Sequence, residues 1–159
     1  MRDVRLPDFP FALPVYVWFR DLDAMGHVNN AVYLSYFEQA RIGYWLSLVA
    51  PAQPTSPRDP RDVGFFVARV EVDFASPALL GEPLLVGCRI SEVGTTSFVF
   101  DYRIVSRQSS IDSEVRLVAS GRSVQVGWDW HEDRKIAITE DLRRRIEAIE
   151  GGALRVRER

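Results

Sequence analysis

The sequence is short of the residues that most metal and redox sites use. It contains one cysteine, Cys88, and two histidines, His27 and His131. A single cysteine excludes an intrachain disulfide and a cysteine-based metal site, so we expect Cys88 to be a small buried hydrophobic residue. Pairing His27 with a nearby acid such as Asp23 would give too few ligands for zinc. The sequence therefore predicts no metal site.

The net charge is also small, and long apolar runs are few. The formal net charge is −2 at pH 7, so no basic face for a nucleic-acid backbone is expected. The N-terminal residues MRDVRLPDFPF carry charges and prolines where a signal peptide needs an apolar run. No window approaches the length of a membrane span. We expect a soluble, cytoplasmic protein with no nucleic-acid partner.

Two common catalytic motifs are also missing. Ser35 lies in a helical pattern without a Ser-His-Asp arrangement or a GxSxG setting, which excludes a serine hydrolase. No glycine-rich phosphate loop is present. With 159 residues and 47% hydrophobic content, the chain is expected to fold as one domain over residues 1–159.

What the sequence does contain is an abrupt change from strand to helix between Val17 and Trp45. Strand-forming residues stop at Asp21 and Asp23, and turn residues follow up to Asn30. Beyond them, apolar residues recur at three- and four-residue steps, which predicts a helix from about residue 30 to 49 with Asn29 or Asn30 as its N-cap. The helix is apolar over more than a narrow stripe, so we expect it to be mostly buried.

The start of this helix offers a chemical opportunity. A helix N-terminus exposes unpaired N–H groups and a partial positive charge, which can hold a developing oxyanion. A carboxylate on Asp23 would lie beside a carbonyl bound there. This combination is suited to acyl transfer without a serine or a metal.

The same residues resemble the signature of a known family. Asp21-Leu22-Asp23, Gly26-His27-Val28-Asn29-Asn30, Tyr33 and Phe37-Glu38-Gln39-Ala40-Arg41 are similar to the motif of hotdog-fold thioesterases of the 4-hydroxybenzoyl-CoA thioesterase-like group. The form DxDxxGHVNN is most similar to the acyl-CoA and acyl-carrier-protein branches, and its departure from the 4-hydroxybenzoyl-CoA enzyme disfavours an aromatic substrate. The resemblance implies an α+β hotdog fold, in which an antiparallel sheet wraps around one long central helix.

The resemblance also implies roles for the residues of the motif. The Asn30 amide would bind the thioester oxygen, with Val28 or Asn29 as further donors. Asp23 would act as general base on water or as a nucleophile that forms a mixed anhydride, and the sequence leaves both routes open. His27 would orient water, donate to the thioester oxygen or cap the loop. Asp21 is interpreted as a turn former.

Substrate contacts are expected from several elements. Side chains such as Tyr33, Phe37 and Phe66 would set the depth of an acyl pocket. Glu38 either forms a solvated ion pair with Arg41 or faces the site. In hotdog dimers the partner subunit contributes residues from regions similar to Thr96 and Ser97.

The expected activity is hydrolysis of an acyl thioester, by a homodimer or tetramer that acts on acyl-CoA or acyl-carrier protein. No cofactor is expected apart from coenzyme A as part of the substrate. The competing hypothesis is a non-catalytic hotdog domain that binds acyl groups or supports assembly.

The remaining elements follow from hydrophobic periodicity. We predict an irregular arm over residues 1–13, a first strand over residues 15–20 that is covered on both faces, and a loop over residues 51–62. Four strands follow, over residues 64–74, 84–93, 97–105 and 113–128, and a short amphipathic helix covers residues 139–149. The last strand changes phase, which predicts a β-bulge near Gly121.

Overall fold

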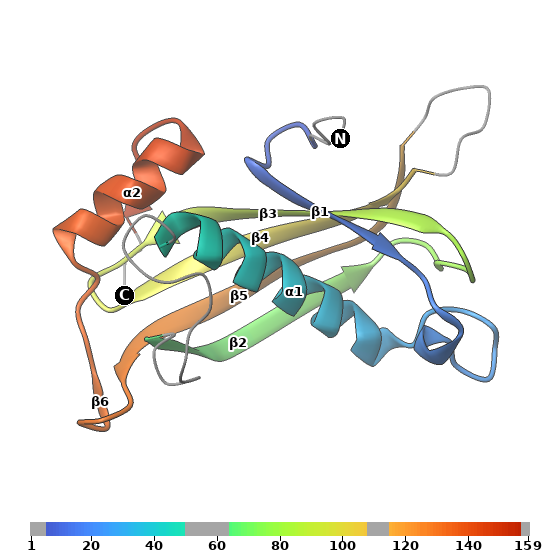
Figure 1. The fold of residues 1–159 in the computed structure, drawn as a ribbon, viewed down its shortest axis with the longest axis horizontal. Coiled ribbons are helices and arrows are strands. Elements are labelled where there is room, and N and C mark those ends of the chain that lie inside the picture. Colours follow the sequence, from blue (N-terminus) through green and yellow to red (C-terminus); the bar gives the residue numbers. More distant parts are fainter. Residues whose placement is uncertain (1–5, 50–63, 108–114, 157–159) are drawn as a thin grey trace.

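The structure is a computed structural model that describes residues 6–49, 64–107 and 115–156. One helix lies across a face of a seven-stranded sheet whose main strand order is β1-β3-β4-β5-β2 (Figure 1). The elements are β1 (Phe11–Tyr16), a 3-10 turn (Phe19–Asp21), α1 (Asn30–Val49), β2 (Phe65–Phe74), β3 (Pro83–Val93), β4 (Ser97–Ser106), β5 (Arg116–Asp129), β6 (Arg134–Lys135), α2 (Glu140–Glu150) and β7 (Arg155–Val156). The main strands pair antiparallel, which confirms the predicted α+β hotdog fold.

The central helix α1 has the predicted bounds. Asn29 caps it, since the Asn29 side-chain oxygen accepts from the amide of Ala31 at 2.9 Å. Its buried residues point into the core: Tyr33, Tyr36, Phe37, Ala40, Arg41, Tyr44 and Leu48. The expectation that the helix is mostly buried is wrong for one flank, where Leu34 is 43% exposed and Ile42 is 40% exposed. One flank of α1 is therefore open in the single chain.

The central strands β3 and β4 bury the residues that their alternation predicts. Leu84, Val86, Cys88 and Ile90 of β3 belong to the main core cluster, as do Phe98, Phe100, Tyr102 and Ile104 of β4. Cys88 is fully buried, and burial raises the pKa of its thiol well above the usual value. Its predicted role as a small core residue is confirmed.

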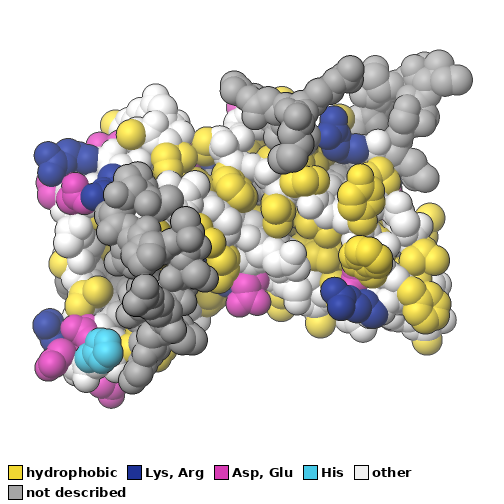
Figure 2. All heavy atoms as spheres, viewed as in Figure 1, with side chains coloured by type: hydrophobic (Ala, Val, Ile, Leu, Met, Phe, Trp, Pro, Cys, Tyr) yellow, Lys and Arg dark blue, Asp and Glu magenta, His cyan; other side chains and the backbone are white. Residues whose placement is uncertain are grey.

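The N-terminal prediction needs correction. The first strand runs over Phe11–Tyr16, and the chain then tightens into a 3-10 turn because the Asp21 carboxylate accepts from the Trp18 amide at 2.9 Å. The expected irregular arm therefore ends before Phe11. Trp18 and Phe19 are 64% and 80% exposed, so this segment is not covered on both faces. Figure 2 shows apolar side chains gathered on the molecule's surface over the start of α1 and the segment before it.

The last long strand, β5, has its bulge in a different place. Pairing is regular from Ser120 to Ser123, and the register shift against β4 falls at Val118. Gly121 is required for another reason, because a Cβ there would collide with the ring of Phe37. With α1 packed so closely, the strand turns small and polar residues inward, including Ser123 and Gln125, which are 1% and 0% exposed. The periodicity of the last strand also predicts an inward face of Val124, Val126 and Trp128 after the bulge, and the structure contradicts this.

The edge strand β2 also departs from strict alternation. A register shift between Val67 and Arg69 inserts one extra residue, Ala68. The alternation predicts a packed face of Phe66, Ala68, Val70, Val72 and Phe74, but Val70 and Phe74 are 40% and 49% exposed, so this face is partly open in one chain.

The C-terminal helix α2 agrees with the prediction. The Thr139 side chain caps it by accepting from the Leu142 amide at 3.2 Å. The carboxylate of Glu150 at its end accepts from the Tyr44 hydroxyl at 2.8 Å and from the Ile90 amide at 2.7 Å. These bonds tie α2 to α1 and β3. Neither helix of the described residues is long and apolar enough to span a membrane. The loop predicted over residues 51–62 lies outside the described residues.

Candidate active site

The segment before α1 is a tight hairpin formed by residues 21–29. The Asn29 amide donates to the Asp21 carbonyl at 2.8 Å, Leu22 bridges Val28, and the Asp23 amide donates to the His27 carbonyl at 2.8 Å. The pairing places Asp23 opposite His27, two residues along the hairpin from the Asp21–Asn29 pair that adjoins the helix.

Asp21 is buried between this hairpin and α1. Its Oδ2 accepts from the Tyr36 hydroxyl at 2.9 Å as well as from the Trp18 amide. Burial, and then the hydrogen bond to Asp21, raise the pKa of Tyr36 far above the ordinary tyrosine value. Asp21 therefore anchors the hairpin to the helix, which is a larger structural role than the turn former predicted from sequence.

Asp23 lies nearer the surface than Asp21. Its Oδ1 accepts from the amides of Met25, at 2.8 Å, and His27, at 3.4 Å. The tip between these residues closes at Gly26, whose φ of +82° favours glycine. Among the described residues, Oδ2 of Asp23 has no hydrogen-bond partner. One oxygen holds the loop and the other is left for a ligand.

The amides at the start of α1 differ in their partners. The Val28 amide donates to the Ala78 carbonyl at 3.0 Å, and the Asn29 and Ala31 amides are satisfied within the hairpin. Within the described parts of the chain, the Asn30 amide has no acceptor. The Val28 side chain is only 2% exposed, so neither its amide nor its side chain is open to a ligand. Asn30 is therefore the donor available at this helix end.

A groove runs along the open flank of α1 towards β2. It has a volume of about 220 Å³ and is lined by Leu34, Ser35, Phe37, Glu38, Arg41, Val67, Val70, Tyr102 and Ser123. It starts one helical turn after Asn30. Tyr33 is buried beside it and its ring lies 5.2 Å from that of Phe74. The first residues that line the groove therefore follow the helix start by one turn.

Charged residues lie at the rim and floor of the groove. The side chain of Glu38 is 63% exposed and lies 3.8 Å from the Arg41 guanidinium. Arg41 is buried and donates to the Tyr102 hydroxyl at 3.2 Å, which lies 2.6 Å from the Ser123 hydroxyl. Burial raises the pKa of Tyr102 to about 12. Both interpretations of Glu38 survive, since it pairs with Arg41 and also lines the groove.

Three predicted substrate contacts lie at the end of the sheet opposite the hairpin: Phe66, Thr96 and Ser97. The Phe66 ring lies 5.3 Å from that of Trp128, and the Thr96 carbonyl accepts from the Gly127 amide at 2.8 Å. Ser97 pairs with Val126, which also pairs with Phe66. This end adjoins the last turns of α1, roughly 25 Å from the helix start. Asp23, His27, Asn29, Asn30 and Tyr33 belong to the hairpin and the first turn of α1, whereas Phe66, Thr96 and Ser97 lie at the opposite end of the sheet.

Within the described residues there is no group of three or more histidine, cysteine, aspartate or glutamate side chains that could hold a metal ion. The hairpin carries the Asp23 carboxylate with one oxygen unpaired, and α1 begins with the Asn30 amide, which has no acceptor among the described residues. Such an arrangement on a hotdog fold is the expected geometry of a thioesterase.

Comparison with known proteins identifies the family. Residues 17–146 match the model of the Thioesterase-like superfamily, and the chain belongs to this family. It is 33% identical over 98 residues, 62% of this chain and 71% of the relative, to the acyl-CoA thioesterase YbgC of Haemophilus influenzae. It is 30% identical to the acyl-CoA thioester hydrolase YbgC of Escherichia coli O6:H1, over 68% of this chain and 78% of that protein.

Solved structures agree with this assignment. A Thermus thermophilus thioesterase complexed with coenzyme A and zinc matches with a TM-score of 0.78 and 37% identity, over 94% of this chain and all of that one. The similarity extends over nearly the whole chain and includes both the hairpin and the sheet.

Proposed function

We propose that this protein hydrolyses acyl-CoA thioesters to a free acid and coenzyme A. The observation that carries the proposal is the contrast between the satisfied amides of Val28 and Asn29 and the open amide of Asn30, beside the partly exposed Asp23. The acyl-CoA thioesterase names of the YbgC relatives and the coenzyme A bound to the Thermus thermophilus thioesterase support it.

In the proposed mechanism the thioester carbonyl oxygen accepts from the Asn30 amide. Positive charge at the helix end stabilises the oxyanion of the tetrahedral intermediate, an effect typically worth about 3 kcal/mol per donor. The free oxygen of Asp23 takes a proton from a water that attacks the carbonyl carbon, or attacks that carbon itself. Collapse of the tetrahedral intermediate breaks the C–S bond and releases the coenzyme A thiolate, and in the second route water then hydrolyses the mixed anhydride on Asp23. His27 lies beside Asp23 in the hairpin and orients the water. The acyl group extends from Asn30 into the groove along α1, where Glu38 lines the rim.

The proposal includes a homodimer formed through β2. This strand is an edge of the described sheet, and edge strands with exposed apolar side chains favour pairing with another chain. Antiparallel pairing about a two-fold axis near Val70 would bring Phe66 of the partner subunit opposite Phe74. Thr96 and Ser97 share the sheet end of Phe66, so the partner would supply all three to the site at the start of α1.

The test is a comparison of the Asp23→Asn and Asp141→Asn variants with the wild type. Release of free thiol is measured with a thiol-trapping reagent over straight-chain acyl-CoAs of several lengths. Asparagine can still accept from the Met25 amide, so the loop is preserved and we expect turnover to fall by at least about 100-fold with the fold intact. Asp141 lies in an exposed ion pair on α2 and its variant should keep wild-type turnover.

Two outcomes would contradict the proposal. Full turnover in Asp23→Asn would remove this carboxylate from the mechanism. Binding of acyl-CoA without thiol release by the wild type would favour the acyl-binding alternative.

A further inference from the structure

The segment between β2 and β3 is hydrogen-bonded to the chain before the hairpin and to the C-terminal strand of the hairpin. At the entrance, the Val17 amide donates to the Glu82 carbonyl at 3.2 Å and the Gly81 amide donates to the Val17 carbonyl at 2.9 Å. At the exit, the Val28 amide donates to the Ala78 carbonyl at 3.0 Å. The position of the helix start therefore depends on where residues 76–82 are held.

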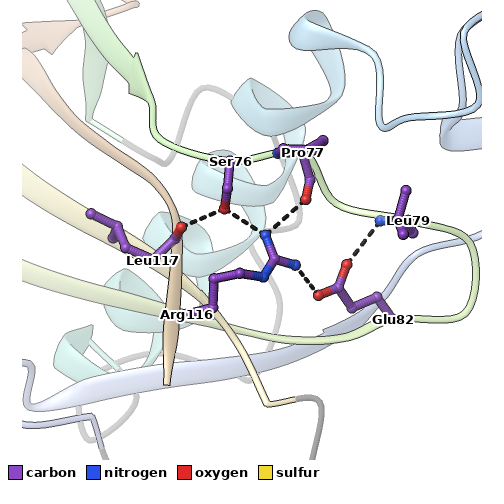
Figure 3. Close-up of polar contacts among 6 residues, drawn as sticks. All are labelled: Ser76, Pro77, Leu79, Glu82, Arg116 and Leu117. Carbon is purple, nitrogen blue, oxygen red and sulfur yellow. Dashed lines mark hydrogen bonds and ion pairs between the residues drawn. The ribbon is translucent and has the colours of Figure 1, made fainter. Parts of the chain in front are cut away.

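A buried carboxylate holds this segment from within (Figure 3). The Glu82 side chain is 1% exposed, and its Oε2 accepts from the Leu79 amide at 2.8 Å. Its Oε1 pairs with the guanidinium of Arg116 at the start of β5. Both oxygens of Glu82 are thus engaged, as a buried charge requires.

Arg116 connects the segment to the sheet. Its Nη1 donates to the Pro77 carbonyl at 2.8 Å and to the Ser76 hydroxyl at 2.5 Å, and that hydroxyl donates to the Leu117 carbonyl at 2.5 Å. Pro77 is the residue directly before Ala78. A single planar guanidinium therefore fixes the backbone next to the carbonyl that receives the Val28 amide.

The β-bulge of β5 provides a second attachment at the same place. Its extra residue, Val118, has a carbonyl that accepts from the amides of Ala75, at 2.9 Å, and Ser76, at 3.1 Å. The bulge and Arg116 together tie residues 75–77 to β5. Ala78 follows immediately and is fully buried, so it has little room to shift.

We propose that Arg116 and Glu82 are positioning residues for the reaction, acting through Ala78 and Val28 on the Asn30 amide. This inference rests on the proposed function. A hydrogen-bond donor displaced by about 1 Å from a developing oxyanion can cost up to about 100-fold in rate, although substrate binding elsewhere is unchanged. We call the contacts of Arg116 and Glu82 with residues 76–79 the brace. Loss of the brace should lower kcat much more than it raises KM.

Arg122 provides a matched control on the same strand. Its side chain is 43% exposed, against 41% for Arg116, and it also pairs with a glutamate, Glu92. Its partners Glu92 and Asp101 lie on β3 and β4, away from the segment of residues 76–82. Arg122→Gln removes a comparable ion pair without touching the support of the hairpin.

The experiment compares Arg116→Gln, Arg116→Lys and Arg122→Gln with the wild type in three measurements. These are kcat and KM for a straight-chain acyl-CoA, the melting temperature, and the hydrogen-exchange rate of the Val28 amide by NMR. We expect kcat of Arg116→Gln to fall about tenfold with KM within about twofold, and exchange at Val28 to accelerate about tenfold. Lysine restores the charge, but its single nitrogen cannot replace the separate donations of Nη1 to Pro77 and Nη2 to Glu82. Arg116→Lys should therefore recover kcat only in part.

Arg122→Gln should leave kcat and Val28 exchange at wild-type values whatever its melting temperature. The inference is overturned if Arg116→Gln keeps wild-type kcat or Val28 exchange, or if Arg122→Gln changes both equally. A wild type without any thiol release would instead reject the proposed function, while the exchange rates would still test the brace.

Discussion

Two aspartates that are two residues apart have opposite environments. Asp21 is buried, and both the Trp18 amide and the Tyr36 hydroxyl donate to its Oδ2. Asp23 uses one oxygen to hold the loop and leaves the other open. A carboxylate that must act on a substrate needs such a free oxygen, whereas a satisfied buried carboxylate serves stability. The structural role of Asp21 and the proposed catalytic role of Asp23 follow from this difference.

Replacing Tyr36 with phenylalanine tests the structural role of Asp21. The variant leaves the buried Asp21 carboxylate without one of its donors, so the free energy of unfolding should fall by about 1–2 kcal/mol. Urea denaturation of Tyr36→Phe measures the change, and Tyr16→Phe is the control because Tyr16 is 61% exposed. Equal stability of the two variants would show that the Tyr36 bond contributes nothing.

At the scale of elements, prediction from sequence succeeded where local signals decide the structure. The helix α1 was predicted with its bounds, because an asparagine cap precedes a long helical pattern. The phase of β5 could not be predicted, since it depends on the bulge at Val118 and on the packing of Phe37 against Gly121, which is on the same face as Ser123 and Gln125. The support from Ala78, Glu82 and Arg116 carries no sequence motif either. It depends on contacts between residues that lie 34 to 65 positions apart in the sequence, from Glu82–Arg116 to Val17–Glu82.

The brace between β2 and β3 makes a prediction about acid stability. Burial alone would raise the pKa of Glu82, but hydrogen bonds from Ser106, Leu79 and Arg116 outweigh it and hold that pKa below 4.5, its ordinary value. A carboxylate whose pKa is lower in the folded state stabilises the folded protein. The contribution of Glu82 to the free energy of unfolding is therefore complete above its unfolded-state pKa and is lost as the pH falls through its folded-state pKa.

Glu82→Gln should therefore cost about 3 kcal/mol at pH 7, and the difference from wild type should shrink as the pH falls below about 4.5. Urea denaturation at pH 7, 5.5, 4 and 3 measures this trend. Glu140→Gln is a suitable control because the Glu140 side chain is 76% exposed. A difference that stays constant with pH would contradict the lowered pKa of Glu82.

On the scale of the whole molecule, one chain does not bring all the predicted site residues together. The flank of α1 is open, β2 is an exposed edge, and Phe66, Thr96 and Ser97 lie far from the hairpin. A symmetric dimer through β2 would close the groove and bring these residues to the helix start of the other subunit. The proposed activity then depends on assembly.

Replacing Val70 with lysine tests this dependence. A charge in the middle of the exposed edge should oppose pairing, so Val70→Lys should sediment as a monomer and lose at least about 90% of its turnover. Val156→Lys, which makes the same change at a 75% exposed site on β7, should remain a dimer and stay active. A monomeric Val70→Lys with wild-type turnover would show that one chain contains the whole site.

The most direct test of the mechanism is the Asn30 amide itself. In ¹⁵N-labelled Asp23→Asn, which should bind an acyl-CoA without cleaving it, titration with the thioester should shift the Asn30 amide proton downfield as it donates to the carbonyl. The Val28 and Asn29 amides, already bonded to protein carbonyls, should shift much less. Saturating acyl-CoA binding with no change at Asn30 would contradict the account.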